Sequence, residues 1–241
     1  MEMSKLRFVV QAPLLYFSLL VVIALGIGAM LYFTDANADS RYIGVLSGLV
    51  TGLGIAAIQF FTQYIEQNTL AEYKKHGLDE FLPNRKDAEY YRKLIQQTEV
   101  GDKIVVMGVT CNRLLEDFAN FSNSQSQDLL EAMARNVDVT LLLPKVRYLI
   151  EPNLSDFNNK TLPKAQAIEA KYPSNFKVLY YDFEPSHSIF LAGSYCLVGP
   201  IFKGLPSRDT PAIKFHKDGR YIKPYLQYIN EAIKNSSANH A

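Results

Sequence analysis

The sequence predicts a hairpin of two transmembrane α-helices followed by one α/β domain with a mostly parallel sheet. Residues 8–34 and 42–65 form two apolar runs that contain no Asp, Glu, Lys or Arg. A helix needs about 20 apolar residues to cross a hydrocarbon core roughly 30 Å thick, and each run meets that length. In the rest of the chain, short β-branched runs alternate with helical patterns, which is the order typical of a parallel α/β sheet.

Charged residues beside the apolar runs predict the orientation in the membrane. Lys5 and Arg7 precede the first run, and Lys74 and Lys75 follow the second. The positive-inside rule then places both termini of a multi-pass membrane protein in the cytoplasm. A cleaved signal peptide is the competing interpretation of the first run, but the run is longer than the apolar region of a typical signal peptide.

These observations divide the chain into four predicted parts. They are a two-helix transmembrane anchor (1–65), a helical stalk and linker (66–86), a cytoplasmic α/β domain (87–234) and a disordered tail (235–241). The formal net charge of +1 gives no indication of a nucleic-acid partner. In a reducing compartment, Cys111 and Cys196 are expected to be free thiols.

The second apolar run carries a face of small and polar residues. Its members are Gly44, Gly48, Gly52 and Ala56, which recur every four residues, together with Ser47, Thr51 and Gln59. Small residues at this spacing let helix backbones approach closely, and polar side chains can bond across the interface. Either this face packs against the first helix of the same chain, or it mediates self-association into a homo-oligomer.

The soluble part contains the hydrophobic runs expected of buried strands. They occur at 103–109, 137–143 and 176–181, followed by a predicted hairpin of 188–191 with 195–198 and a fifth or edge strand at 212–215. Helical patterns lie at 87–98, 113–121, 128–135, 165–172 and 224–234. The alternation favours an α/β domain.

The segment that begins at His187 resembles part of a known catalytic motif. The order of strands and helices over residues 87–234 resembles one half of the phospholipase D-like fold, whose signature is H-x-K-x4-D. In that family the His is the nucleophile, the Lys binds phosphate and the Asp supports the site. Here Ile189 stands at the Lys position and Ser194 at the Asp position. Without the Lys, the charge that develops in the transition state loses its main stabiliser, so we expect no phospholipase D chemistry.

The resemblance implies a concave ligand site at one edge of the sheet. The candidate residues are His187, Ser188, Ser207, Arg208, Asp209, Thr210 and Lys214. Such a site would receive a phosphate-bearing ligand, whereas the alternative interpretation of residues 204–211 is an ordinary solvated loop. The sequence shows no metal-ligand spacing and no cofactor motif, so we expect neither a metal nor a cofactor.

Three functional hypotheses follow from this layout. Two apolar spans joined to a small cytoplasmic domain resemble the two-transmembrane effectors of bacterial antiphage systems, such as those of retrons and of cyclic-oligonucleotide signalling. That resemblance implies a domain that senses a ligand, a cytoplasmic protein or a nucleotide or nucleic acid. It also implies helices that assemble in a bacterial inner membrane and perturb it. The alternatives are a membrane-tethered phosphodiesterase or nuclease of phospholipase D-like type and a scaffold that holds a partner at the membrane.

Overall fold

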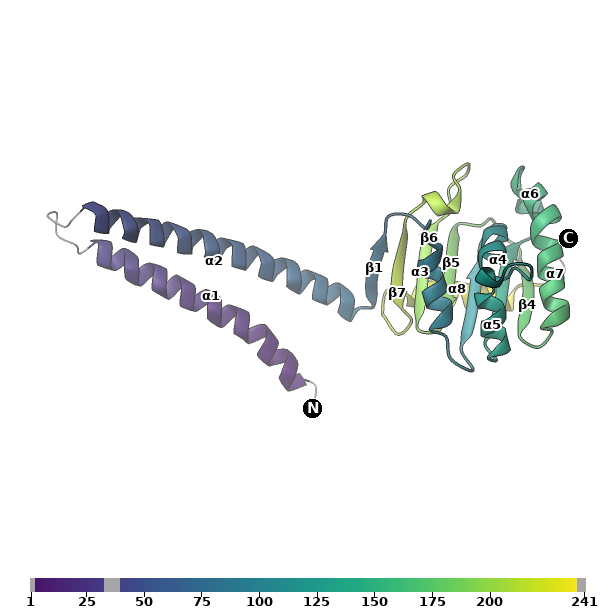
Figure 1. Ribbon diagram of the computed structural model, residues 1–241, viewed down its shortest axis with the longest axis horizontal. Helices are drawn as coiled ribbons and strands as arrows, with labels where there is room; N and C mark the ends of the chain where they lie inside the picture. The colour runs from purple at the N-terminus through teal and green to yellow at the C-terminus, as the bar shows by residue number, and fades with distance from the viewer. Residues whose placement is uncertain (1–2, 33–39, 238–241) are drawn as a thin grey trace. The chain divides into compact units, whose positions relative to one another are not determined.

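The chain divides into two compact units, Met1–Glu72 and Tyr73–Ala241 (Figure 1). The structure is a computed structural model that describes residues 3–32 and 40–237. The first unit holds helix α1 (Met3–Tyr32) and most of helix α2 (Ser40–Lys75), which continues into the second unit. Residues 35–39 of the predicted loop 35–41 lie outside the described residues, and residues 40 and 41 belong to α2.

The prediction of a two-helix transmembrane hairpin is corrected to one helix with the properties of a membrane span. Among the described residues, Ile43–Lys75 is long and apolar enough to cross a membrane, with a mean hydropathy of 1.8 over its 18-residue window. In α1 the described apolar stretch is Tyr16–Met30. At 1.5 Å per residue this stretch is about 22 Å long, which is short of a hydrocarbon core of roughly 30 Å. The side chains of residues 8–15 lie outside the described set.

Helix α2 contacts α1 on the side that carries Ala57 and Phe61. The rings of Phe17 and Phe61 lie 5.4 Å apart, and Ala57 is buried. On the small face, a Cβ added at Gly44, Gly48 or Gly52 would meet nothing within 4 Å. Within the described part of this unit, the small face is therefore open and does not mediate the contact with α1.

The second unit is built on a mixed seven-stranded sheet with the order β1-β7-β6-β5-β2-β3-β4. The strands are β1 (Leu78–Leu82), β2 (Lys103–Met107), β3 (Asp138–Pro144), β4 (Phe176–Tyr181), β5 (His187–Ala192), β6 (Tyr195–Pro200) and β7 (Ala212–His216). Strand β1 lies within the predicted linker 66–86. Strand β7, predicted as a fifth or edge strand, lies inside the sheet between β6 and β1.

The expectation of a mostly parallel sheet is wrong. Only the pairs β2–β3 and β3–β4 are parallel, whereas β1–β7, β7–β6, β6–β5 and β5–β2 are antiparallel. The reason lies in the connections. Gly193 and Ser194 alone join β5 to β6, and a turn this short can connect only antiparallel strands, whereas a parallel pair needs a crossover of a dozen or more residues.

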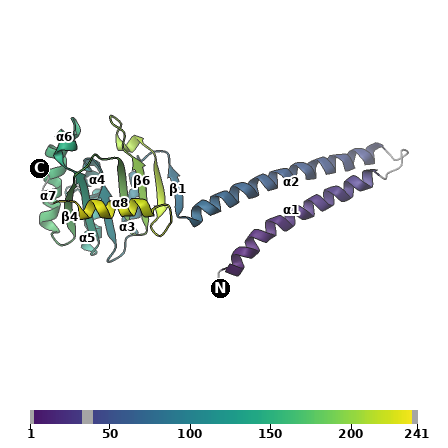
Figure 2. The same ribbon diagram turned by 180° about the vertical axis from the view of Figure 1, so that it is seen from behind.

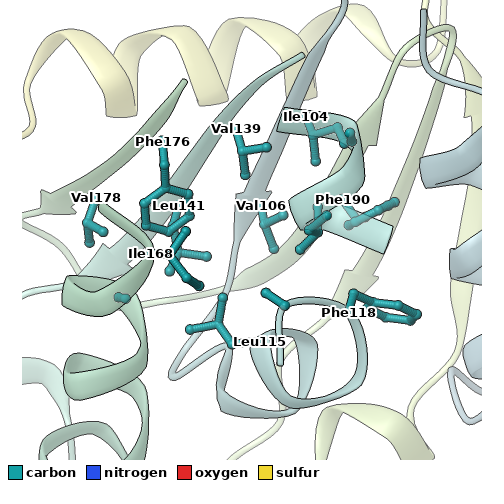
Figure 3. Close-up of a cluster of buried hydrophobic side chains, with 14 of the residues drawn as sticks. Ile104, Val106, Leu115, Phe118, Val139, Leu141, Ile168, Phe176, Val178 and Phe190 are labelled. Carbon is teal, nitrogen blue, oxygen red and sulfur yellow. The ribbon is translucent and has the colours of Figure 1, made fainter. Parts of the chain in front are cut away.

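Helices cover both faces of the sheet (Figures 1 and 2). One face carries α3 (Ala88–Gln96), α4 (Asn112–Phe118), α5 (Asp128–Ala134) and α7 (Leu162–Lys171), the last preceded by α6 (Asn153–Asp156) and a π-helical turn (Phe157–Thr161). The larger hydrophobic core lies under these helices, where Leu115 and Phe118 of α4 face Val106 of β2 and Phe190 of β5 (Figure 3). The other face carries the single helix α8 (Lys223–Lys234), which closes a second core through Ile229 and Ala232.

Only two residues, His76 and Gly77, separate α2 from β1, and they are tightly packed. The carbonyl of His76 accepts a hydrogen bond from the Tyr221 N–H at 3.2 Å, and the carbonyl of Gly77 accepts one from the His216 N–H at 2.8 Å. Gly77 has φ +91°, and a Cβ there would lie 2.3 Å from the Cα of Gly219. The end of α2 is thus locked to the turn between β7 and α8.

The first residues of the predicted disordered tail are ordered. The Ser237 N–H donates to the carbonyl of Tyr180 at 3.1 Å, and the Tyr180 N–H donates to the carbonyl of Ser237 at 2.8 Å, which extends the β4 edge of the sheet by one bridge. Residues 238–241 lie outside the described residues.

Candidate functional site

One edge of the sheet gathers most of the predicted site residues. The parallel strands β2, β3 and β4 end there at Met107, Pro144 and Tyr181. The register places Met107 beside Ile189, His187 beside Pro200 and Leu82 beside Ala212, so β5 and β7 begin at this edge while β6 and β1 end at it. Ligands of open α/β sheets bind outside the carboxyl ends of the parallel strands, so this edge is the natural place for a site.

The sheet separates the predicted residues into two groups. Successive side chains of a strand point to opposite faces, so His187 and Ser188 cannot share one pocket. His187 lies on the α8 face, where its ring contacts Tyr225 at 5.6 Å and Tyr228 at 6.2 Å. Ser188 lies on the opposite face, as does Phe190, which packs in the larger core.

A chain of hydroxyl groups holds the imidazole of His187. Its Nδ1 lies 2.9 Å from the Oγ of Ser186, and that oxygen lies 3.4 Å from the hydroxyl of Tyr228. Among the described residues no hydrogen bond or ion pair joins His187 to a lysine, an arginine or a carboxylate. The Nε2 atom of the half-buried ring is therefore the atom that remains for a ligand.

A hollow of about 470 Å³ lies beside His187 on the α8 face. Its apolar lining comes from β1, β6, β7 and α8, and includes Phe81, Val198, Ile213, Phe215 and Tyr225. The rings of Phe215 and Tyr225 stack at 6.1 Å, and Phe81 remains 65 % exposed at the rim. Among the described residues, α8 is the only helix on this face (Figure 2). Apolar side chains at the corner formed by β1 and β7, such as Phe81, therefore remain accessible.

The second group is organised by Arg85, which the sequence did not reveal. Its guanidinium is buried and donates hydrogen bonds from one nitrogen to the carbonyl of Pro200 at 3.1 Å and to the hydroxyl of Thr210. Gly199 leaves the space that the guanidinium fills, since a Cβ there would lie 3.0 Å from the Arg85 Cζ. No carboxylate within the described ranges pairs with Arg85, and burial lowers its pKa. The hydrogen-bond partners of Arg85 lie 115 and 125 residues further along the chain, so the sequence around Arg85 gives almost no sign of its burial. The one local feature is the bend at Pro83 and Asn84 before it.

The segment Ser207–Asp209 forms an exposed 3₁₀ turn beside Arg85. The Thr210 hydroxyl contacts the carbonyl of Ser207 at 2.9 Å, and the carbonyl of Arg208 accepts the Arg85 N–H at 2.8 Å. Asp209 pairs with Lys86 at 2.9 Å, and this hydrogen bond, with the nearby charges, holds the pKa of Asp209 below its usual value. These interactions connect the turn to the segment that follows β1.

Lys214 does not belong to either group. It lies in the middle of β7, where its Nζ pairs with Asp79 at 2.8 Å and sits 4.1 Å from the ring centroid of Tyr195. A lysine held in this way by a carboxylate and an aromatic ring stabilises the sheet and is not presented to a ligand at the strand ends.

The geometry offers little for phosphodiester chemistry. Ile189, at the position of the family's lysine, is fully buried in the core under α8. Cys111 has a left-handed backbone with φ 54°, and burial raises its pKa to about 12, so it is a neutral thiol at physiological pH. Within the part of the chain that the structure describes, no three His, Cys, Asp or Glu side chains are grouped so that they could hold a metal ion.

Comparisons with known proteins give no family for this chain. No family model matches it, and no curated protein matches it. Among solved structures it is similar to TrmBL2, an archaeal chromatin protein described with a novel mode of DNA binding, with a TM-score of 0.45 and 13% sequence identity. That match covers 78% of this chain and 70% of the other.

Proposed function

We propose that this protein is a membrane-tethered, non-enzymatic effector whose second unit senses a ligand or partner. In this proposal α2 crosses a bacterial inner membrane and assembles with α2 of other copies to perturb it. Antiphage defence is the proposed biological setting, and it rests on resemblance of layout alone. The phospholipase D-like ancestry of residues 87–234 is likewise part of the proposal.

The observation that carries the proposal is the two-residue junction between α2 and β1. Phe81 of β1 lines the hollow beside His187, so a molecule bound there contacts the strand that directly follows the apolar helix. The same junction is locked to the turn before α8 through Gly77 and Gly219. Because β1 is joined to α2 by only two residues, a ligand that shifts β1 would also move the end of α2.

The open face of α2 supports self-association as the output. Glycines at 44, 48 and 52 leave room for a second helix backbone, and no described side chain fills that room. The hydroxyl of Thr51 donates to the carbonyl of Ser47 at 3.0 Å, which satisfies its proton inside the helix and leaves the oxygen as an acceptor. Interhelical contacts of polar groups in a bilayer contribute on the order of 0.6–2 kcal/mol each, so several must act together.

The test is a double substitution, Gly48→Leu with Gly52→Leu. It blocks close approach of two α2 helices while preserving hydrophobicity, so we expect normal insertion with loss of cross-linked oligomers and of membrane depolarisation. The matched control is Gly26→Leu with Gly28→Leu, which adds the same two side chains to α1, also in open space. Equal depolarisation by wild type and the α2 variant would refute the proposed output.

The finer localisation is tested by reporter fusions. Lys74 and Lys75 at the end of α2 favour a cytoplasmic second unit, so a fusion at Ala241 should report the cytoplasm. A fusion at Met1 distinguishes the arrangement with both termini in the cytoplasm, in which α1 must also cross, from a single crossing by α2. Periplasmic signal from the Ala241 fusion would contradict the orientation.

The alternative, a membrane-tethered phosphodiesterase or nuclease, is separated from the effector by His187→Ala. If the protein is an effector, His187→Ala removes a contact to the ligand, and neither wild type nor variant hydrolyses a phosphodiester. Hydrolysis of a generic phosphodiester such as bis(p-nitrophenyl) phosphate by wild type, abolished in His187→Ala and retained in His216→Ala, would make the enzyme the better account.

A further inference from the structure

The hollow beside His187 has the features of a small-molecule site rather than of a bare patch of sheet. Its volume of about 470 Å³ lies within the range of roughly 300–1,000 Å³ that small-ligand pockets occupy. Its walls are mostly aliphatic, and Phe81, Phe215 and Tyr225 add three aromatic rings. Such pockets bind apolar bodies and use one or a few placed polar groups to orient them.

His187 supplies the orienting polar group. When the Tyr228 hydroxyl donates to Ser186 and Ser186 donates to Nδ1, the proton of the neutral ring is on Nε2. In the protonated ring Nε2 also carries a proton. In these two states the hydroxyl chain fixes the imidazole and Nε2–H is a hydrogen-bond donor, whereas in the neutral tautomer whose Nδ1–H donates to Ser186 the Nε2 atom is an acceptor. Probes that carry an acceptor or a donor distinguish these arrangements.

We propose that this hollow binds a flat, aromatic small molecule that carries one hydrogen-bond acceptor, a carboxylate or a carbonyl, facing Nε2 of His187. The aromatic body is favoured because offset or edge-on contacts with Phe215 and Tyr225 add to the burial of apolar surface. The inference rests on the proposed sensing function, for which it names the ligand class. Since Phe81 belongs to β1, this ligand contacts the strand that follows α2.

The absence of tryptophan from the chain makes a direct binding assay possible. Phe81→Trp places a single indole at the rim of the hollow, in the full chain reconstituted in nanodiscs of phosphatidylcholine and phosphatidylglycerol. Benzoate is the probe, acetate supplies the acceptor without the ring, and benzylamine supplies the ring with a donor. We expect a saturable change of indole emission with benzoate and none with the other two probes over the same concentration range.

Two further variants locate the benzoate. His187→Ala should raise the dissociation constant about tenfold, because a charge-assisted hydrogen bond is lost. His216→Ala, at the opposite end of β7, is the matched control and should leave it unchanged. Ile213→Phe narrows the hollow while retaining the imidazole, so it too should raise the dissociation constant for benzoate. Near-UV circular dichroism checks that each variant is folded.

Three results would overturn the inference. One is the absence of a saturable change with benzoate, and another is an equal response to acetate. The third is indole emission that depends on the number of chains in a disc before any probe is added, which would show that a second copy covers the hollow. None of these measurements uses depolarisation, so failure here is distinguishable from failure of the proposed effector function.

Discussion

Replacement of Gly77 by alanine should destabilise the second unit more than any other glycine-to-alanine change in it. Two separable costs meet at this residue. At φ +91° a side chain adds roughly 1–2 kcal/mol of backbone strain. The new Cβ would also lie 2.3 Å from the Gly219 Cα, and relief of such overpacking costs about 1–3 kcal/mol.

Other glycines isolate each cost. Gly101→Ala, at φ +85° with open space, carries strain alone, and Gly219→Ala carries the steric cost alone, since its Cβ would meet the Gly77 Cα at 2.5 Å. Alanine also restricts the unfolded chain, which offsets about 0.4–1 kcal/mol in every variant. The net loss expected for Gly77→Ala is therefore about 2–4 kcal/mol, against about 1 kcal/mol or less for Gly101→Ala.

Thermal unfolding of the full chain in detergent, followed by near-UV circular dichroism of its tyrosines, measures the difference. For a unit of about 170 residues, 1 kcal/mol corresponds to roughly 2–4 °C in Tm, so Gly77→Ala should lower Tm by about 5–15 °C. Equal Tm values for Gly77→Ala and Gly101→Ala would refute the close packing of the junction against the turn before α8.

Three further predictions concern Arg85, the two cysteine thiols and Tyr181. Arg85→Met removes the bonds to Pro200 and Thr210, so trypsin should cut faster after Lys203, whereas Arg135→Met, at an exposed arginine, should not change the rate. Burial raises the pKa of Cys111 and Cys196 to about 12, so neither thiol should react with iodoacetamide at pH 8 without urea, and stability should fall between about pH 9 and 12 as the unfolded thiols ionise first. Fast labelling of the folded chain would contradict that assignment. Tyr181→Phe leaves the Gly108 carbonyl without its donor at 3.1 Å, so urea unfolding should show a loss of about 1–2 kcal/mol, and an unchanged midpoint would count against the bond.

The strands that the sequence predicts well are those with a local hydrophobic signal. Lys103–Met107 and Asp138–Pro144 are nearly continuous β-branched or leucine runs, as expected of strands buried on both faces. Strand β1, with the sequence LDEFL, has charged residues at its centre and lies at the sheet edge, so its composition resembles that of a linker. Its place in the sheet depends on pairing with β7, which lies more than 130 residues further along the chain.

Strand direction and the candidate site depended on non-local contacts in the same way. Alternation of strands and helices between residues 87 and 181 predicts the parallel part correctly, but the later hairpins reverse the chain and produce the antiparallel majority. The predicted residues at 187, 188 and 207–210 do reach one edge, yet strand alternation places His187 and Ser188 on opposite faces. Arg85 was missed because it lies in the connection between β1 and α3, where no periodic pattern distinguishes a buried arginine from a solvated one.

The hydrogen bonds at the end of α2 determine where the chain can be cut. Strand boundaries alone would suggest a soluble fragment that starts at Leu78. That fragment would leave the N–H groups of His216 and Tyr221 without their acceptors, which are the carbonyls of Gly77 and His76. It would also remove the His76 ring that packs edge-on against Tyr221 at 5.5 Å. Expression fragments should therefore keep the last turn of α2 from Tyr73 onward. The same holds for chimaeras that exchange the anchor for another helix, so that the foreign sequence ends before the hydrogen-bonded residues His76 and Gly77.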